Sequence, residues 1–185
     1  MFIVKYTGQF GFIKPWTAVR DEEVYSQQFL TPSIIKGMEL KLFPELLNKN
    51  LFTYKIQKIM RHRLSYQSLS RQQEQIQPKD FIVKNRIASR PKSILWRGVM
   101  IEPVLHLAFD NYNDAEKVST EHICLCRNED ILFPENKDYA MDNEEFERLD
   151  GFELIFEKSE EAFLVGFNRF DNAEPMYGRF QITKS

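Results

Sequence analysis

The triplet Arg61-His62-Arg63 has the residue types and spacing best suited to chemistry on a phosphodiester. An imidazole can act as general acid or base, and two flanking guanidinium groups can hold a phosphate. The same triplet could instead contact a nucleic-acid backbone without cutting it, which is the commoner outcome. His106 lies within an apolar run and is expected to be a core histidine.

Two tryptophans stand next to cations. Trp96-Arg97 follows Arg90-Pro91-Lys92, and Trp16 follows Lys14-Pro15. A ring or a guanidinium plane in such a setting can stack on an unpaired base while neighbouring cations hold its phosphates. The alternative is that each tryptophan belongs to the core and Arg97 is solvated.

These motifs lie in a chain whose charge is unevenly distributed. Residues 55–97 hold eleven Lys and Arg against two acids, although the net charge of the chain is −2. Residues 1–100 hold 17 basic and 7 acidic side chains, a balance of +10, and residues 101–185 hold 8 and 20, a balance of −12. This asymmetry favours contact with a polyanion such as nucleic acid. The alternative is that the two halves face each other across an ordinary fold.

Other chemistries find little support. The run His122-Ile-Cys124-Leu-Cys126 could supply zinc ligands, but it lacks the second ligand cluster that a four-coordinate site needs. We therefore expect no metal, and we interpret the cysteines as reduced, buried or half-buried strand thiols of a cytoplasmic protein. The chain has no phosphate-binding glycine loop, dinucleotide fingerprint or nucleophile elbow, so no cofactor is expected.

The composition predicts a folded α+β protein. A hydrophobic fraction of 43% and sixteen Phe are enough for a core, and no run approaches the 18 apolar residues typical of a membrane span. The start of the chain, Met1–Tyr6, does not resemble a signal peptide. We expect one domain over residues 1–185, with a possible small appendage from about residue 128.

Hydrophobic spacing predicts the order of the elements. Thr31-Pro32-Ser33 is typical of a helix start, and the helical spacing continues to Phe43. Apolar residues partly alternate with polar ones over residues 51–64, which favours a strand. Residues 65–79 indicate an exposed, Gln-rich excursion, and residues 136–150 indicate an acidic surface helix. The expected strands are 2–6, 93–96, 99–109, 152–156, 163–170 and 179–183, which together predict an antiparallel sheet with few helices.

The segment Thr31-Pro-Ser-Ile-Ile-Lys36-Gly37-Met38 resembles the helix start of CRISPR-associated RAMP proteins. It is most similar to that of the Cas-five family, which holds the 5′ handle of the guide RNA in type I, Cascade-like effector complexes. Three further stretches agree in order, namely Gly8–Pro15, Arg90–Val99 and Phe163–Arg179. Gly98 replaces an acid of the family pattern.

This resemblance implies a ferredoxin-like (RRM-like) fold, with an RNA end against the first helix and the basic strands. Lys36 takes the place of the family's helix cation, and Arg97 that of its strand arginine. Guide RNA and other subunits of the complex are the implied partners. Together with the basic stretch, the candidate RNA contacts are Lys14, Trp16, Lys36, Arg61, His62, Arg63, Arg71, Arg86, Arg90, Lys92, Trp96 and Arg97.

One branch of the family cleaves precursor guide RNA without metal, using a Tyr six residues after the signature Gly and a later Lys-His pair. Here Phe43 stands where that branch has its Tyr. Lys117 is followed by Val118 in place of His, and His122 is the nearest imidazole. These departures favour a binder without catalytic activity. One alternative is a metal-independent endoribonuclease with His62 or His122 as general base and Lys117 or Arg61 stabilising charge. The other is a protein-interaction module that binds no RNA.

Overall fold

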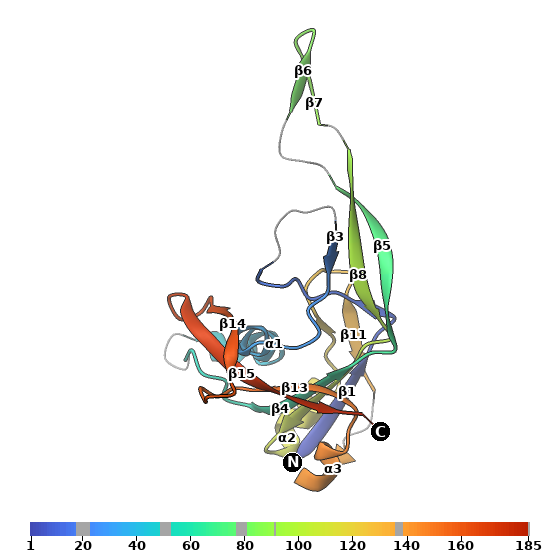
Figure 1. Ribbon diagram of the computed structural model, residues 1–185. Coiled ribbons are helices and arrows are strands. Elements are labelled where there is room, and N and C mark those ends of the chain that lie inside the picture. The colour runs from blue at the N-terminus through green and yellow to red at the C-terminus, as the bar shows by residue number, and fades with distance from the viewer. Residues whose placement is uncertain (18–22, 49–52, 77–80, 91, 136–138, 185) are drawn as a thin grey trace.

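We describe a computed structural model of the chain, in which all residues are described except 18–22, 49–52, 77–80, 91, 136–138 and 185. The cation Lys79 of the basic stretch lies outside the described residues. Figure 1 shows a sheet-based body from which one long arm projects.

The body is built on a ferredoxin-like core. Its sheet has the order β11-β1-β9-β4, and every neighbouring pair is antiparallel. The core elements follow the chain order β1 (Phe2–Thr7), α1 (Pro32–Leu42), β4 (Ile59–Ser65), β9 (Val104–Phe109), α2 (Tyr112–Val118) and β11 (Ile131–Pro134). This βαββαβ arrangement confirms the predicted α+β class and its antiparallel sheet.

Further strands extend this sheet in both directions. The C-terminal strands pair in the order β4-β13-β15-β14, so the last part of the chain continues the main sheet. The added strands are β10 (Ile123–Cys124), β12 (Tyr139–Ala140), β13 (Gly151–Ile155), β14 (Phe163–Asn168) and β15 (Glu174–Thr183).

Helix α1 begins where the sequence predicts. Thr31 is its N-cap residue in an extended conformation, and its carbonyl accepts from the backbone N–H groups of Ile34 and Ile35 at 3.0 Å. Pro32 stands in the first turn, where a missing N–H costs nothing. The helix ends at Leu42, and Pro44 opens the short 3₁₀ helix η1 (Pro44–Leu47).

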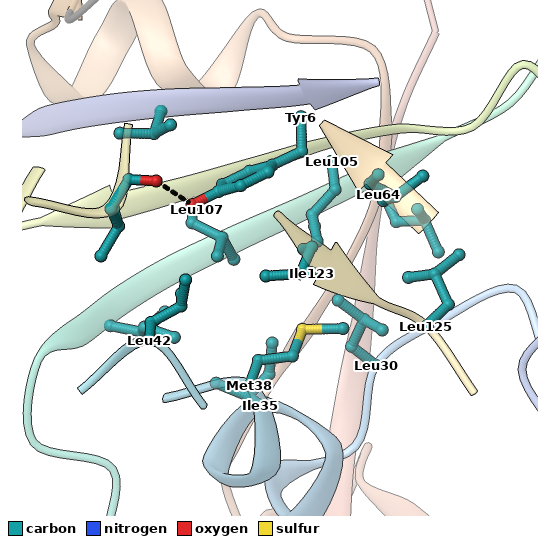
Figure 2. Packing of buried hydrophobic residues seen from close by; sticks show 14 of the residues in the cluster. Tyr6, Leu30, Ile35, Met38, Leu42, Leu64, Leu105, Leu107, Ile123 and Leu125 are labelled. Carbon is teal, nitrogen blue, oxygen red and sulfur yellow. Dashed lines mark hydrogen bonds between the residues drawn. The ribbon is translucent and has the colours of Figure 1, made fainter. Parts of the chain in front are cut away.

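The main core lies between α1 and the sheet (Figure 2). Ile35 and Met38 of α1 pack in the same cluster as Leu105 and Leu107 of β9. The buried Tyr6 hydroxyl donates to the carbonyl of Val118 at 2.9 Å, and burial raises the pKa of this phenol above its usual range. The buried Tyr6 hydroxyl thus has a hydrogen-bond partner, as buried polar groups generally do.

The opposite face of the sheet is covered by α3 (Asn143–Glu147). Phe146 of this helix is fully buried against Ile3 and Ala108. A capping box between Asp142 and Glu145 starts the helix. The acidic surface helix predicted over residues 136–150 is therefore present, but much shorter. Within the described part of the chain, no helix is long and apolar enough to cross a membrane.

The arm, residues 68–76, 81–90 and 92–101, grows out of the neighbouring core strands β4 and β9. Strand β5 (Ser68–Ile76) follows β4, and β8 (Ser93–Ile101) precedes β9, so one hairpin forms both sheet and arm. The two strands pair from Ser68↔Ile101 to Ile76↔Ser93, and β6 (Ile82–Lys84) and β7 (Ile87–Ser89) form the tip (Figure 1). The predicted exposed, Gln-rich excursion over residues 65–79 is confirmed as exposed over Ser68–Ile76, and these residues form a strand because β8 satisfies their backbone groups.

Two short strands brace the base of the arm. β2 (Phe10–Gly11) pairs with the end of β8, and β3 (Glu23–Tyr25) runs parallel to its middle. A Cβ atom at Gly98 would overlap the ring of Tyr25. The glycine that replaces an acid in the family pattern therefore lets this ring lie against the arm.

Candidate nucleic-acid interface

The two arginines of the triplet Arg61-His62-Arg63 are committed to the body of the protein. Arg63 is fully buried and donates from Nη1 to the carbonyls of Glu147 (3.0 Å) and Leu149 (2.7 Å), and from Nη2 to the Glu153 carboxylate (3.1 Å). Arg61 makes a bidentate contact with Glu153 at 2.9 and 2.5 Å and an ion pair with Glu147 at 2.7 Å. At this point the basic and acidic halves do face each other. The geometry leaves neither arginine available to a phosphate.

His62 is buried on the other side of the same strand. Its ring stacks on Phe156 with the centroids 5.2 Å apart, and burial lowers the pKa of the imidazole to about 4. Among the described residues its Nε2 has no hydrogen-bond partner. A neutral imidazole without solvent access cannot exchange a proton with a bound strand.

The other two residues of the nuclease alternative occupy different settings. Lys117 is exposed, pairs with Glu45 at 2.9 Å and lies 5.2 Å from the ring centroid of Phe43. His122 is also exposed, beside the ring of Phe133 at 6.2 Å. One buried and two exposed residues with separate partners do not form an acid–base constellation.

Lys36 is a buried structural cation. Its side chain is 1% exposed, pairs with Glu39 at 2.7 Å and donates to the carbonyl of Lys55 at 2.9 Å. Glu39 in turn accepts from the backbone N–H groups of Gln57 and Lys58 at 2.7 and 2.6 Å. The pair anchors the segment that leads into β4. We therefore leave Lys36 out of the interface that the resemblance implied.

The distal arm, residues 81–90 and 92, presents cations that pair with no acid among the described residues. Its four cations, Lys84, Arg86, Arg90 and Lys92, are all exposed, and residues 81–101 contain no Asp or Glu. No ion pair to these four is found within the described part of the chain, in contrast to the paired cations of the body. The Arg90 guanidinium lies 4.7 Å from the centroid of the Phe81 ring, which is itself 58% exposed. Cations next to an exposed ring suit a phosphate backbone with unstacked bases.

The part of the arm nearest the body, formed by β5 and β8, carries two arginines that already have partners. The Arg71 guanidinium lies 3.9 Å from the Trp96 ring centroid, and its Nε pairs with Glu23 at 2.8 Å. Arg97 pairs with Glu74 across the hairpin and is 17% exposed. Trp96 is therefore partly covered by Arg71, and Arg97 is neither solvated nor fully available.

A cleft of about 410 Å³ beside α1 collects three further cations. Lys14 and Arg169 line it with Lys41, which pairs with Glu121 at 3.1 Å, and no carboxylate is among its described lining residues. The Arg169 guanidinium occupies the space over Gly37, where a Cβ would lie 2.6 Å from Nη2. Sequence reasoning missed Arg169, and Gly37 of the helix motif was the signal that could have pointed to it.

Cys124 and Cys126 line the same cleft as free, exposed thiols. The prediction that they are buried or half-buried was wrong, because Cys124 lies on the two-residue edge strand β10, Cys126 lies just beyond it, and both are exposed. No cluster of three or more metal-ligating side chains occurs among the residues described.

Trp16 is 48% exposed and makes an edge-on contact with Phe167, with the ring centroids 5.6 Å apart. It stands two residues after Lys14, yet its contacts are with the C-terminal strand β14. The ring is neither fully buried nor free of contacts, so its use in RNA binding stays a prediction.

Comparison with known proteins supports the fold. No family model matches the chain, and no curated protein matches it. A solved structure, the type III-B Cmr-beta complex bound to cognate target RNA and AMPPnP, contains a chain with a similar fold. The TM-score is 0.54 at 11% identity, over 100% of this chain and 84% of the other. The chain therefore has a fold similar to that of one chain of this complex, and the predicted α+β, ferredoxin-like class is confirmed.

Proposed function

We propose that this protein is an RNA-binding subunit of a CRISPR effector complex and that it holds guide RNA without cleaving it. The observation that carries the proposal is the projecting arm (Figure 1), whose four distal cations are exposed and form no ion pair with a described residue. The solved structure of similar fold belongs to a complex bound to RNA, which supports the same class of ligand.

The arm supplies contacts of a kind that does not depend on base sequence. Each Lys or Arg that neutralises a phosphate releases condensed counterions, so affinity falls steeply with salt. Phe81 offers a ring for base stacking beside these cations, at a site where Arg90 already covers one face. Backbone contacts position an RNA strand and leave its sequence to base pairing.

The cleft beside α1 is our candidate for the 5′ handle, in the manner of the Cas-five family of type I complexes. Lys14 and Arg169 offer charge for a phosphate, and the motif residue Gly37 admits the Arg169 side chain. The assignment to type I rests on the helix motif, whereas the similar solved structure is of type III-B.

The proposal assigns no RNA cleavage to this chain. His62 is buried with a pKa of about 4, and neither Lys117 nor His122 contacts it. Phe43, at the position of the family's catalytic Tyr, is fully buried and flanked by the Lys58 and Lys117 ammonium groups.

The test is RNA binding by the purified protein with a matched pair of double variants. Arg90→Ala with Lys92→Ala removes two arm cations, and Arg148→Ala with Lys158→Ala removes two exposed cations of the body. We expect the arm variant to lower affinity for repeat-derived RNA and to reduce the slope of log K against log salt by about 1.4, at about 0.7 for each phosphate contact with a single strand. Equal effects of the two variants would overturn the arm assignment.

The handle assignment is tested separately. Lys14→Ala with Arg169→Ala should weaken binding of repeat RNA that carries its 5′ handle more than binding of the same RNA without it. A natural complex purified with its neighbours should also retain repeat-derived RNA with a common 5′ end. Protein that copurifies with other subunits but with no RNA would leave the protein-interaction alternative standing instead.

A further inference from the structure

Cys124 and Cys126 are two free thiols on the solvent side of one short segment. Burial alternates along this segment, because Ile123 and Leu125 are 1% and 6% exposed whereas both cysteines are exposed. Figure 2 shows Ile123 and Leu125 among the core side chains that pack with Met38 of α1. The core therefore holds the segment from one side and leaves both thiols accessible from the other.

Both thiols line the cleft beside α1, whose volume is about 410 Å³. This volume lies in the range of sites that bind small molecules, about 300–1,000 Å³. Ile13, Ile34 and Met38 form part of the apolar lining. A small ligand in the cleft therefore has an apolar wall to pack on and two sulfur atoms beside it.

The charged groups that line the cleft are all cations. Lys14 and Arg169 are exposed and form no ion pair with a described residue. Lys41 is the third cation, and it pairs with Glu121 at 3.1 Å. Cations in a cleft with low-dielectric walls raise the local concentration of anions. Lys14 and Arg169 should therefore attract an anionic reactant to the thiols.

The acids that follow the thiols in the chain do not cancel this attraction. Glu129 and Asp130 both pair with Arg127, at 3.4 and 2.7 Å. Asp130 is also fully buried, and neither acid lines the cleft. The setting of the two thiols is thus electropositive and exposed, which is the setting in which protein thiols exchange with disulfides.

We propose that Cys124 and Cys126 form a thiol-exchange site that selects anionic disulfides, of which glutathione disulfide is the biological type. One cysteine loses its proton to solvent, and its sulfur attacks a sulfur atom of the reactant. The S–S bond of the reactant breaks, and a new S–S bond joins the cysteine to one glutathione. The other glutathione leaves as a thiolate that takes up a proton, so atoms and electrons balance.

The adduct closes the cleft to RNA. It fills the volume and brings glutathione carboxylates to Lys14 and Arg169, which are our candidate phosphate contacts. Handle RNA is then excluded until a reducing thiol removes the adduct. This consequence rests on the proposed function, whereas the exchange reaction itself does not.

The first experiment measures the selectivity of exchange with two aromatic disulfides, anionic dithiobis(nitrobenzoate) and neutral dithiodipyridine. Urea-unfolded protein gives the reference ratio of the two rates, since it carries the same thiols without the cleft. We expect the ratio of anionic to neutral rates to be about tenfold higher in the folded protein. The difference should shrink as salt is added.

A matched pair of double variants separates the cleft from the general charge of the protein. Lys14→Ala with Arg169→Ala should lose the preference for the anionic reagent. Arg148→Ala with Lys158→Ala removes two exposed cations outside the cleft and should keep it. Equal ratios in folded and unfolded protein would overturn the proposal, and so would equal losses in the two variants.

Mass spectrometry identifies the product that glutathione disulfide forms. The expected product is a mixed disulfide on Cys124 or Cys126 that dithiothreitol removes. These are the only two cysteines of the chain, so Cys124→Ser with Cys126→Ser provides the blank. Protein that forms no adduct, or only a bond between its own two cysteines, would contradict the proposal.

Failure of this inference can be distinguished from failure of the proposed function. Repeat RNA with its 5′ handle should bind the reduced protein and bind the adduct more weakly. The double serine variant should bind it equally with and without glutathione disulfide. Equal binding by reduced protein and adduct would refute closure of the cleft while RNA binding stands. Reduced protein that binds no RNA would refute the proposed function, and the rate ratios would still decide the exchange site.

Discussion

The triplet Arg61-His62-Arg63 and the distal arm are both basic, yet they have opposite environments. The triplet is folded against α3 and β13, where Glu147 and Glu153 neutralise its arginines. The arm cations stand on a projecting hairpin with no acid in residues 81–101. Local charge density alone therefore does not identify a binding surface. What matters is whether the fold supplies each cation with an internal partner.

The largest effect is expected from breaking the buried cluster. Arg63→Ala would leave the buried Glu153 with one guanidinium partner fewer and would remove hydrogen bonds to two backbone carbonyls. We expect a loss of about 3–5 kcal/mol in the free energy of unfolding, as for other buried pairs that lose one partner. Urea denaturation measures it, and a loss below about 1 kcal/mol would show that the cluster is not buried as described.

The second prediction concerns the loss of folding stability as the pH falls. The pKa of His62 is about 4 in the folded protein and about 6.5 in an unfolded chain, so the unfolded state takes up the proton first as the pH falls. His62 should therefore contribute stability that is fully present above pH 6.5 and is lost between about pH 6.5 and 4. The loss amounts to at most about 3 kcal/mol.

Stability measured against pH for the wild type and for His62→Gln checks this. The variant should lose less stability across the same window, since its side chain does not titrate. The remaining slope would include His106, whose pKa is also lowered to about 4, chiefly by burial. Parallel curves for the two proteins would mean that His62 is solvated, which would reopen its use in catalysis.

A smaller effect is expected at the base of the arm. Gly98→Ala would place a methyl group against the Tyr25 ring and force β3 away from β8. We expect a loss of about 1–3 kcal/mol in the free energy of unfolding, as in other overpacked sites. In a double-mutant cycle, Tyr25→Ala should recover part of this loss, and strict additivity of the two changes would argue against the contact.

The smallest stability effect is expected in the arm itself. Arg86→Ala removes an exposed side chain with no described partner, so the free energy of unfolding should change by less than about 0.5 kcal/mol. RNA affinity of the same variant should nevertheless fall, and its salt slope should decrease by about 0.7. Measured beside Arg63→Ala, this variant separates a binding cation from a structural one. A large loss of stability with unchanged RNA affinity in Arg86→Ala would show that Arg86 is a structural cation.

The sequence by itself determined several parts of this protein. The Thr31-Pro32-Ser33 start and the helical spacing after it predicted α1, because capping and hydrophobic periodicity are local properties. The antiparallel α+β class followed from the order of the strands, and the resemblance of one motif implied its ferredoxin-like form. The basic stretch was also evident, and part of it, the distal arm, remains our candidate RNA contact.

Only the tertiary structure decided which cations are available. Arg61 and Arg63 looked equivalent to Arg86 and Arg90 in the sequence, since the acidic partners of the first two lie elsewhere in the chain. Glu153 is 90 residues from Arg63, and Leu149, whose carbonyl it also contacts, is 86 away. Arg169 joins the cleft beside α1 from the acidic half for the same reason. Pairing across such separations depends on strand register and sheet order, which no local pattern encodes.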